Sequence, residues 1–183
     1  MIYIETEKGS GSGFIITENG YAVTCAHVIS GCKEIYVKIH NEEDDVFSAK
    51  LINIDENVDI ALLKLEDGNY YYSYIEMSEN PYPGEEIVIY GYPFGSRMHD
   101  NVMQLNISFA KGYVSSNQIK NGIDRTFLDI SAKAGNSGSP IVSTKSGKVI
   151  GILCGSTLGG HDNREEINYM LPISYINKII IQE

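Results

Sequence analysis

The chain has 183 residues, of which 43% are apolar and 21% are charged, a composition that fits a globular protein and excludes a disordered or fibrous one. Its formal net charge is -10, from 24 acidic and 14 basic residues, so its surface repels nucleic-acid phosphates and anionic membranes. We therefore expect neither nucleic acid nor a membrane as a partner. No apolar run approaches the roughly 20 residues that a membrane-spanning helix needs.

The cysteines and the N-terminal residues bear on cellular location. Cys25, Cys32 and Cys154 form no regular disulfide spacing, so we expect free, buried thiols in a reducing compartment. The opening residues, MIYIETEKGSGSG, contain no basic region followed by an apolar core, so no secretory signal is expected. These features together predict a cytoplasmic location.

Short runs of β-forming residues, separated by turn signals, follow one another along the chain. Asn-Gly and Ser-Gly pairs predict tight turns at residues 19–20, 121–122 and 146–147, because these residue types tolerate a positive φ. In chain order, the predicted strands cover residues 13–17, 21–25, 34–40, 47–54, 59–65, 85–93, 104–116, 125–131, 139–143, 148–155 and 167–173.

One helix is predicted, in the last residues, ISYINKIIIQ. It places Ile173, Ile176 and Ile180 on one stripe, with Pro172 in the first turn. So many short strands with so little helix between them predict an all-β fold, either a sandwich or a barrel. If the strands form two barrels, the irregular residues 68–85 are the natural junction between them.

Three stretches contain candidate catalytic residues. In VTCAHVI, His27 lies at the end of a predicted strand, where a lone histidine could equally be a partly buried ring bound to a backbone carbonyl. Cys25 and His27 would make a metal pair, but no second Cys/His cluster completes a tetrahedral site, so no metal and no other cofactor is expected. In NVDIALLKL, Asp59 precedes a run that must be buried, and it could either begin a strand or orient an imidazole.

The third stretch, SAKAGNSGSP, frames Ser137 with small residues. An attacking serine needs such neighbours, because backbone N–H groups must converge on the oxyanion of the transition state. The amides of Gly135 and Ser137 can do so if Gly135 adopts the dihedrals that only glycine adopts easily. A plain Gly/Ser turn is the alternative, but His27, Asp59 and Ser137 follow one another in the chain order of the chymotrypsin-type triad. We therefore predict acyl-transfer catalysis.

These stretches resemble those of a trypsin-like serine protease with the chymotrypsin fold, and most of all the protease domain of the Deg/HtrA family. The resemblance covers about residues 11 to 180. It rests on GSGFIITENGYAVTCAHVI for the first strand pair and the histidine motif, DIALLKL for the aspartate motif, and GNSGSP for the serine motif. GYPFG matches the loop before the main strands of the second half, and INYMLPI matches the last strand.

The resemblance implies two packed six-stranded antiparallel β-barrels with a C-terminal helix. Residues 1–80 would form the N-terminal barrel with His27 and Asp59, and residues 81–183 the C-terminal barrel with Ser137 and the helix. Together they would make one protease domain. The oxyanion hole would comprise Gly135, Asn136 and Ser137, with Asn136 contributing only its backbone. Asn136 stands where digestive relatives have an aspartate that pairs with a new N-terminus, so activation of that kind is not expected.

The resemblance also places the substrate-binding residues. They would be Ser131 near the base of the primary pocket, Cys154, Gly155 and Ser156 along one wall, and Ile167, which either narrows the pocket or packs into the core. No carboxylate falls at the base, so a preference for Lys or Arg is not expected.

The expected function is that of a serine endopeptidase acting on a polypeptide substrate. No PDZ domain follows the helix in this sequence, so we expect regulation by a partner protein or by additional domains, with this chain as the effector part of a larger system. Two alternatives remain open. The chain could be a catalytically silent trypsin-like module that binds peptide or protein partners, or an esterase-like hydrolase, which the absence of βαβ alternation disfavours.

Overall fold

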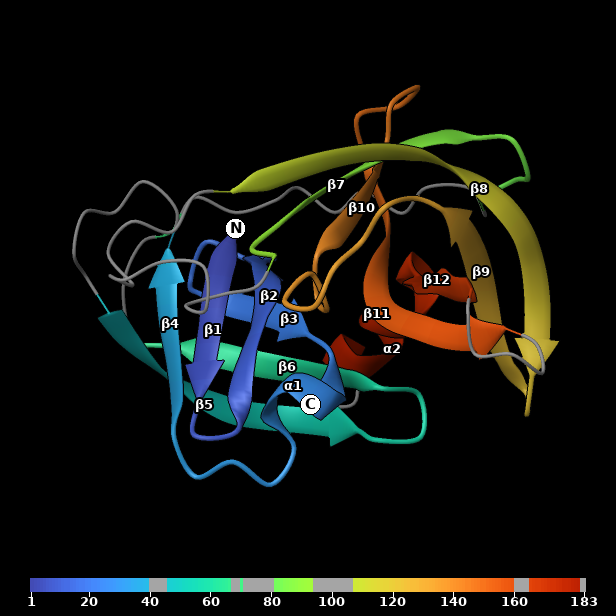
Figure 1. The fold of residues 1–183 in the computed structure, drawn as a ribbon. Helices are drawn as coiled ribbons and strands as arrows, with labels where there is room; N and C mark the ends of the chain where they lie inside the picture. The colour runs from blue at the N-terminus through green and yellow to red at the C-terminus, as the bar shows by residue number, and fades with distance from the viewer. Residues whose placement is uncertain (40–45, 67–69, 71–80, 94–106, 160–164, 182–183) are drawn as a thin grey trace.

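The computed structural model describes residues 1–39, 46–66, 70, 81–93, 107–159 and 165–181. Two closed antiparallel barrels of six strands each lie side by side in Figure 1, and two helices accompany them. This arrangement confirms the predicted all-β class and the pair of six-stranded barrels with a C-terminal helix. The predicted boundary at residues 80 and 81 stays a prediction, because residues 71–80 lie outside the described residues.

The first barrel closes in the order β1-β2-β3-β6-β5-β4. Gly20, with φ 89°, completes the predicted turn between β2 and β3. Strand β1 was not among the predicted strands, and β2 begins four residues earlier than expected, at Gly9. The strands of this barrel are β1 (Ile2–Thr6), β2 (Gly9–Ile15), β3 (Tyr21–Thr24), β4 (Ile35–Ile39), β5 (Val46–Asp55) and β6 (Ile60–Leu65).

The second barrel closes in the order β10-β11-β12-β9-β8-β7. Asn121 and Gly122, with φ values of 54° and 77°, form the predicted turn between β8 and β9, and Gly147, with φ 70°, lies in the turn before β11. The strands are β7 (Glu86–Gly91), β8 (Ser108–Lys120), β9 (Ile123–Asp129), β10 (Pro140–Ser143), β11 (Val149–Gly159) and β12 (Glu165–Pro172).

Helix α2 (Ile173–Ile181) follows β12 directly, and Pro172 ends that strand instead of opening the helix. The helix packs against β5 and β6 of the first barrel and against β11 and β12 of the second. Ile173 and Ile176 of the predicted stripe are buried, and Ile180 is partly buried and packs against the same core; Ile179, which was not predicted, is buried as well. A helix lodged between two barrels buries a wider face than one stripe. The described residues include no helix that is long and apolar enough to cross a membrane.

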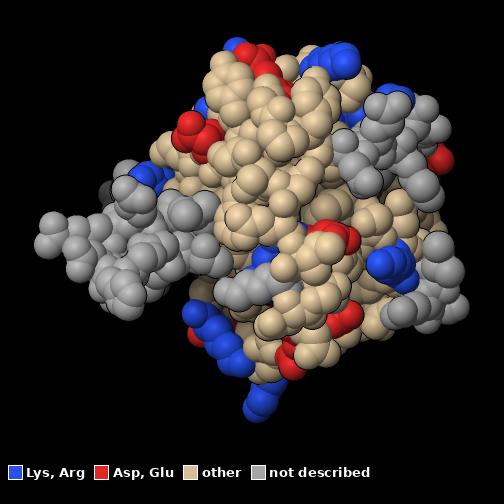
Figure 2. Space-filling view, turned by 90° about the vertical axis from the view of Figure 1, so that its right-hand side faces the viewer, with Lys and Arg blue, Asp and Glu red and all other residues tan. Residues whose placement is uncertain are grey.

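The hydrophobic core of the first barrel continues across the junction into the second barrel. One buried cluster contains Phe14 and Leu62 from the first barrel together with Ile152 and Leu171 from the second, and it extends to Ile176 of α2. A smaller cluster fills the second barrel alone. The two barrels are therefore held at a fixed junction, which we call the seam. On the face of the second barrel drawn in Figure 2, acidic and basic side chains are interspersed, so the negative net charge is not gathered there.

Candidate active site

His27 lies in a one-turn helix, α1 (Ala26–Ile29), which begins two residues after β3 ends at Thr24. The prediction that His27 ends a strand was therefore wrong, because the chain turns into this helix instead. His27 Nδ1 lies 2.8 and 3.0 Å from the two carboxylate oxygens of Asp59, and the backbone N–H of His27 donates to Asp59 Oδ1 over 2.9 Å. Since a carboxylate only accepts, Nδ1 carries the proton and Nε2 is left with a free lone pair.

Asp59 is presented by the turn between β5 and β6. Asp55 Oδ1 accepts hydrogen bonds from the backbone N–H groups of Asn57 and Val58, at 3.0 and 3.1 Å, and Asp59 N–H donates to the Asp55 carbonyl over 2.9 Å. Asp55 thus ends β5 and closes the turn with its side chain, whereas Asp59 is the last residue of the turn and leaves its carboxylate free for His27. Asp59 has a φ of 76°, a left-handed conformation that Asp tolerates better than most residues. This turn therefore aims the Asp59 carboxylate at α1.

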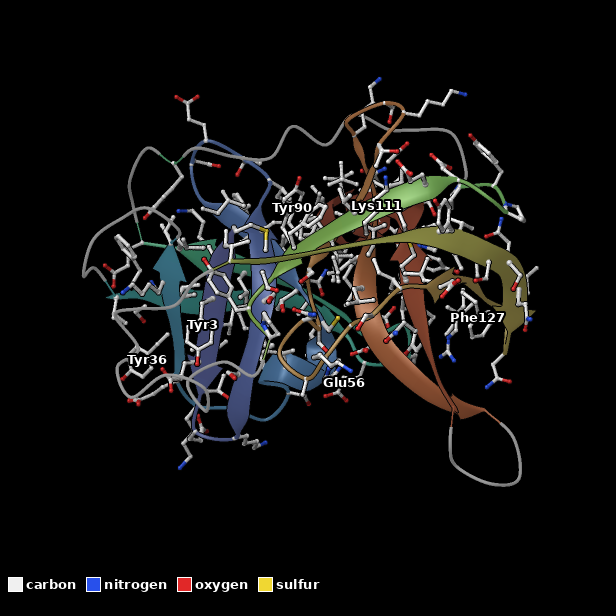
Figure 3. The ribbon with its side chains drawn as sticks, turned by 45° about the horizontal axis from the view of Figure 1, so that its top comes forward. Tyr3, Tyr36, Glu56, Tyr90, Lys111 and Phe127 are labelled. Atoms are coloured by element: carbon white, nitrogen blue, oxygen red, sulfur yellow. The ribbon has the colours of Figure 1, made fainter. Side chains whose placement is uncertain are left out.

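A second contact joins the same turn to α1. Ser30, just after the helix, donates its hydroxyl to the carboxylate of Glu56, which Figure 3 labels beside α1. Together with the bonds between His27 and Asp59, this contact holds the histidine helix and the aspartate turn in one orientation.

Ser137 lies in the loop between β9 and β10, and residues 133–139 of that loop are called the serine loop below. Two turns follow one another there: Asn136 N–H donates to the Lys133 carbonyl over 3.0 Å, and Ser139 N–H donates to the Asn136 carbonyl over 2.9 Å. Gly135 and Gly138, the third residues of these turns, have φ values of 96° and 89°. A closing hydrogen bond with positive φ at the third residue is typical of a type II turn.

Glycine is required at position 138 for a second reason. A Cβ atom there would lie 1.9 Å from the Ser12 carbonyl oxygen and 2.6 Å from Thr24 Oγ1, so β2 and β3 leave no room for a side chain. Ser139 is not among the described residues with positive φ, so its side chain causes no backbone strain there. The serine loop is therefore pressed directly against the first barrel.

Ser12 of β2 fixes this loop, although no sequence motif marks it. Its hydroxyl is fully buried, donates to the Gly135 carbonyl over 2.7 Å, and accepts from Tyr92 N–H over 3.0 Å. Its backbone N–H donates to the Ser137 carbonyl over 2.8 Å. One residue of the first barrel thus holds the carbonyls on both sides of Asn136. Only the fold, which brings residues more than 120 positions apart into contact, could have revealed this.

The parts of the site meet in a cavity of about 410 Å³ at the seam. His27 and Asp59 line it from the first barrel, and Ser137 lines it from the serine loop. Tyr169 forms part of the wall, and burial, reinforced by the nearby Cys154 and Asp59, raises the pKa of its phenol to about 12. Its hydroxyl is therefore neutral at physiological pH. The remaining lining residues are Ala132, Lys133, Ala134, Leu153, Cys154, Gly155 and Asn168.

The predicted substrate-binding residues are only partly brought together. Cys154 and Gly155 line the cavity, but Ser131 is exposed and lies outside the lining, where Ala132 is the first residue of that segment. The reason is that the chain leaves β9 at Asp129 and bends before it reaches the cavity. Ser156 and Ile167 lie in β11 and β12, opposite Asn168 and Thr157, and their side chains are outside the described part of the structure.

Asn136 contributes no side chain to the cavity. It is 5% exposed, and its side-chain oxygen lies near Gly91 without a hydrogen-bond partner, as does the hydroxyl of Ser139. This placement fits the expectation that Asn136 acts only through its backbone.

Two thiols lie beneath the pair formed by His27 and Asp59. Cys25, between β3 and α1, donates to the Leu153 carbonyl over 3.1 Å, and Cys154 of β11 lies 3.8 Å from the Asp59 carbonyl. Both cysteines are free and buried, as predicted, and Cys32 is free and half-buried. Burial, followed by the hydrogen bond and charge of Cys154, raises the pKa of the Cys25 thiol well above its usual range.

An all-β double barrel with a histidine, an aspartate and a serine at the seam defines a trypsin-like peptidase fold and site. A family model described as the trypsin-like peptidase domain matches residues 11–152, and the chain belongs to that family.

Within it, the relatives are proteases of the DegP and HtrA type, which confirms the resemblance drawn from the motifs. A probable periplasmic serine endoprotease, DegP-like, from Hahella chejuensis is 34% identical over 145 residues, 79% of this chain and 29% of the relative. Serine protease HTRA1 of Xenopus tropicalis is 31% identical over 180 residues, 97% of this chain and 37% of the relative. The crystal structure of the serine endoprotease from Yersinia pestis has a TM-score of 0.80 at 25% identity and covers 99% of this chain and 61% of its own.

This chain thus spans about a third of the length of the two curated relatives. The name of the Hahella relative places that protein in the periplasm, so it does not support the predicted cytoplasmic location, which stays a prediction.

Proposed function

We propose that the chain is a serine endopeptidase that hydrolyses peptide bonds with His27, Asp59 and Ser137. The observation that carries this proposal is the double contact of His27 Nδ1 with the Asp59 carboxylate, at 2.8 and 3.0 Å, on the wall of the cavity that Ser137 also lines. That contact fixes the tautomer in which Nε2 is free to take a proton, as a general base for a serine hydroxyl requires.

In the first step, His27 takes the proton of Ser137 as its hydroxyl oxygen attacks the carbonyl carbon of the substrate. Asp59 stabilises the imidazolium that forms and stays ionised. His27 then gives the proton to the leaving amine, which departs and leaves an acyl-enzyme on Ser137. Water, activated by His27 in the same way, releases the acid and restores the serine.

The amides of Gly135 and Ser137 would stabilise the oxyanion. The positive φ of Gly135 supports this role, because it makes residues 133–136 a type II turn. A type I turn has a negative φ at this position and would reverse the direction of the Gly135 N–H. The bond from Ser12 to the Gly135 carbonyl favours the same turn. Loss of one such donor costs roughly 3 kcal/mol of transition-state stabilisation in serine proteases.

The substrate is proposed to be a polypeptide with an uncharged side chain in the primary pocket. Among the described lining residues, Asp59 is the only carboxylate, and it is engaged by His27, so a Lys or Arg side chain would meet no countercharge. The names of the relatives, which are serine proteases and endoproteases, agree with a polypeptide substrate.

A fluorophosphonate probe tests the proposal, because it reacts only with an activated serine. We expect labelling of the wild type, none of Ser137→Ala, and strongly reduced labelling of His27→Ala. Cleavage of a peptide library by the wild type alone would then establish endopeptidase activity and its side-chain preference. A folded wild type that takes up no probe and cleaves no peptide would contradict the proposal and favour the silent peptide-binding module.

A further inference from the structure

Three metal-binding side chains from three separate segments meet at the floor of the active site. The sulfur atoms of Cys25 and Cys154 and a carboxylate oxygen of Asp59 all lie within 4.8 Å of one another. Cys25 comes from the residue between β3 and α1, Asp59 from the turn before β6, and Cys154 from β11 of the other barrel. The sequence predicted no metal site, because nothing completed the pair of Cys25 and His27, whereas the fold brings a second cysteine and an aspartate to Cys25.

We propose that Cys25, Cys154 and Asp59 form an inhibitory site for a thiophilic divalent cation such as Zn²⁺. Thiolates and a carboxylate are ligands that Zn²⁺ binds well, with bonds of about 2.3 Å to sulfur and about 2.1 Å to oxygen. Three atoms spaced by the full 4.8 Å would each lie about 2.8 Å from a common centre, so about 0.5 to 0.7 Å of movement by each would complete the bonds.

Oxidation of the two thiols to a disulfide is the main competing reaction for such a pair. It would need the sulfur atoms to approach to about 2.05 Å with a restricted torsion angle. It would also join the two barrels covalently and would leave Asp59 out. The presence of the carboxylate beside both sulfurs therefore favours the cation.

The binding reaction releases two protons. The cation replaces the thiol hydrogens, which in the cation-free form point toward backbone carbonyls: Cys25 contacts that of Leu153 at 3.1 Å, and Cys154 contacts that of Ile152 at 3.6 Å. One divalent cation, two thiols and one carboxylate give a complex with a single net negative charge and two free protons.

The cavity gives the cation a route to this floor. Asp59 and Cys154 both line the cavity, and the Asp59 side chain is 20% exposed, whereas Cys25 is fully buried behind them. Three protein ligands leave one position of a tetrahedral ion for water from the cavity.

A cation at this site would act directly on the proposed catalysis. It would share the carboxylate on which His27 depends, and its positive charge would oppose the formation of imidazolium. Inhibition therefore rests on the proposed function, whereas binding of the cation does not.

Co²⁺ is a suitable probe of binding, because thiolate ligands give it an intense near-ultraviolet charge-transfer band that Zn²⁺ abolishes by displacement. With the full, reduced chain, we expect one equivalent of Co²⁺ to produce this band. Cys25→Ala should weaken Co²⁺ binding at least about 10- to 100-fold, the loss that even an outer-shell substitution causes. Cys32→Ala, at the half-buried third cysteine, is the matched control and should leave the band unchanged. If Cys25→Ala fails to fold, Cys25→Ser takes its place in the Co²⁺ measurement, because serine has nearly the side-chain volume of cysteine.

The second measurement is inhibition of fluorophosphonate labelling by Zn²⁺, with each variant compared to its own rate in the presence of a chelator. We expect strong inhibition of the wild type and of Cys32→Ala, and little inhibition of Cys25→Ala. Ser137 is not a ligand of the cation, and Ser137→Ala should therefore keep the Co²⁺ band. A wild type that shows the band but takes up no probe would refute the catalytic proposal and leave the cation site standing.

Two results would overturn the cation site: a wild type without a thiolate-to-cobalt band, or a band that survives both Cys25 variants. Loss of two hydrogens by mass, with no band, would instead establish the disulfide. Undiminished Zn²⁺ inhibition of Cys25→Ala would show that the ion acts elsewhere, for example on His27.

Discussion

Replacement of Ser12 by alanine should both lower the free energy of unfolding and slow the reaction of Ser137 in the serine loop. The buried hydroxyl donates to the Gly135 carbonyl at 2.7 Å and accepts from Tyr92 N–H at 3.0 Å, so its removal leaves one acceptor and one donor unsatisfied. Each such buried group costs ~1–3 kcal/mol, which gives ~2–6 kcal/mol for the pair. That is a large share of the ~5–15 kcal/mol by which most domains are stable.

Urea unfolding followed by circular dichroism suits this measurement, because the chain has no tryptophan. Ser10→Ala, two residues earlier on β2, is the control, since the structure describes no hydrogen bond of its hydroxyl. We expect an earlier midpoint for Ser12→Ala at an unchanged slope, and slower fluorophosphonate labelling under conditions where the variant is still folded. Equal midpoints for the two variants would show that the hydrogen bonds of Ser12 do not stabilise the fold. Equal labelling rates would show that Ser12 does not control the geometry of the serine loop.

Three further predictions concern single positions. Gly138→Ala should be more damaging than Gly122→Ala, because both have positive φ but only the former places a Cβ against backbone, at 1.9 Å; melting temperatures compare them. Ile176→Ala should cost ~2–5 kcal/mol in urea unfolding, since it empties a fully buried position between the barrels, while Ser174→Ala on the exposed side of α2 should cost little. Asp59→Asn should lower kcat about 10⁴-fold in a peptidase assay, with unfolding almost unchanged, and a loss below tenfold would contradict its role.

The fold class was predictable because strand alternation and Asn-Gly turns are local signals. The strand β1 and the first half of β2 were missed, and the second of these has a clear physical cause. GSGSG has no branched or aromatic side chains, and its position in the sheet comes from pairing with β1, where Gly11 lies opposite Ile4. Helix α1 was missed because four residues are too few for a helical period to show.

The candidate residues of the site were predictable for a related reason, since His27, Asp59 and Ser137 each lie in a distinctive local stretch. The residues around them were not. Ser12 has its role only because the serine loop packs against β2, and Cys25 meets Cys154 only because the seam joins β3 to β11. Contacts of this kind depend on how distant segments are placed, and a single sequence does not record that placement.

Helix α2 has a consequence for how the protein is made. It packs against both barrels, yet it is synthesised after every strand, so a ribosome releases His27, Asp59 and Ser137 before the element that fastens the two halves together. Nascent barrels can fold one after the other, but the buried isoleucines of the seam find their partners only when residues 173–181 have emerged. The buried core that the two barrels share is therefore complete only when residues 173–181 have been synthesised.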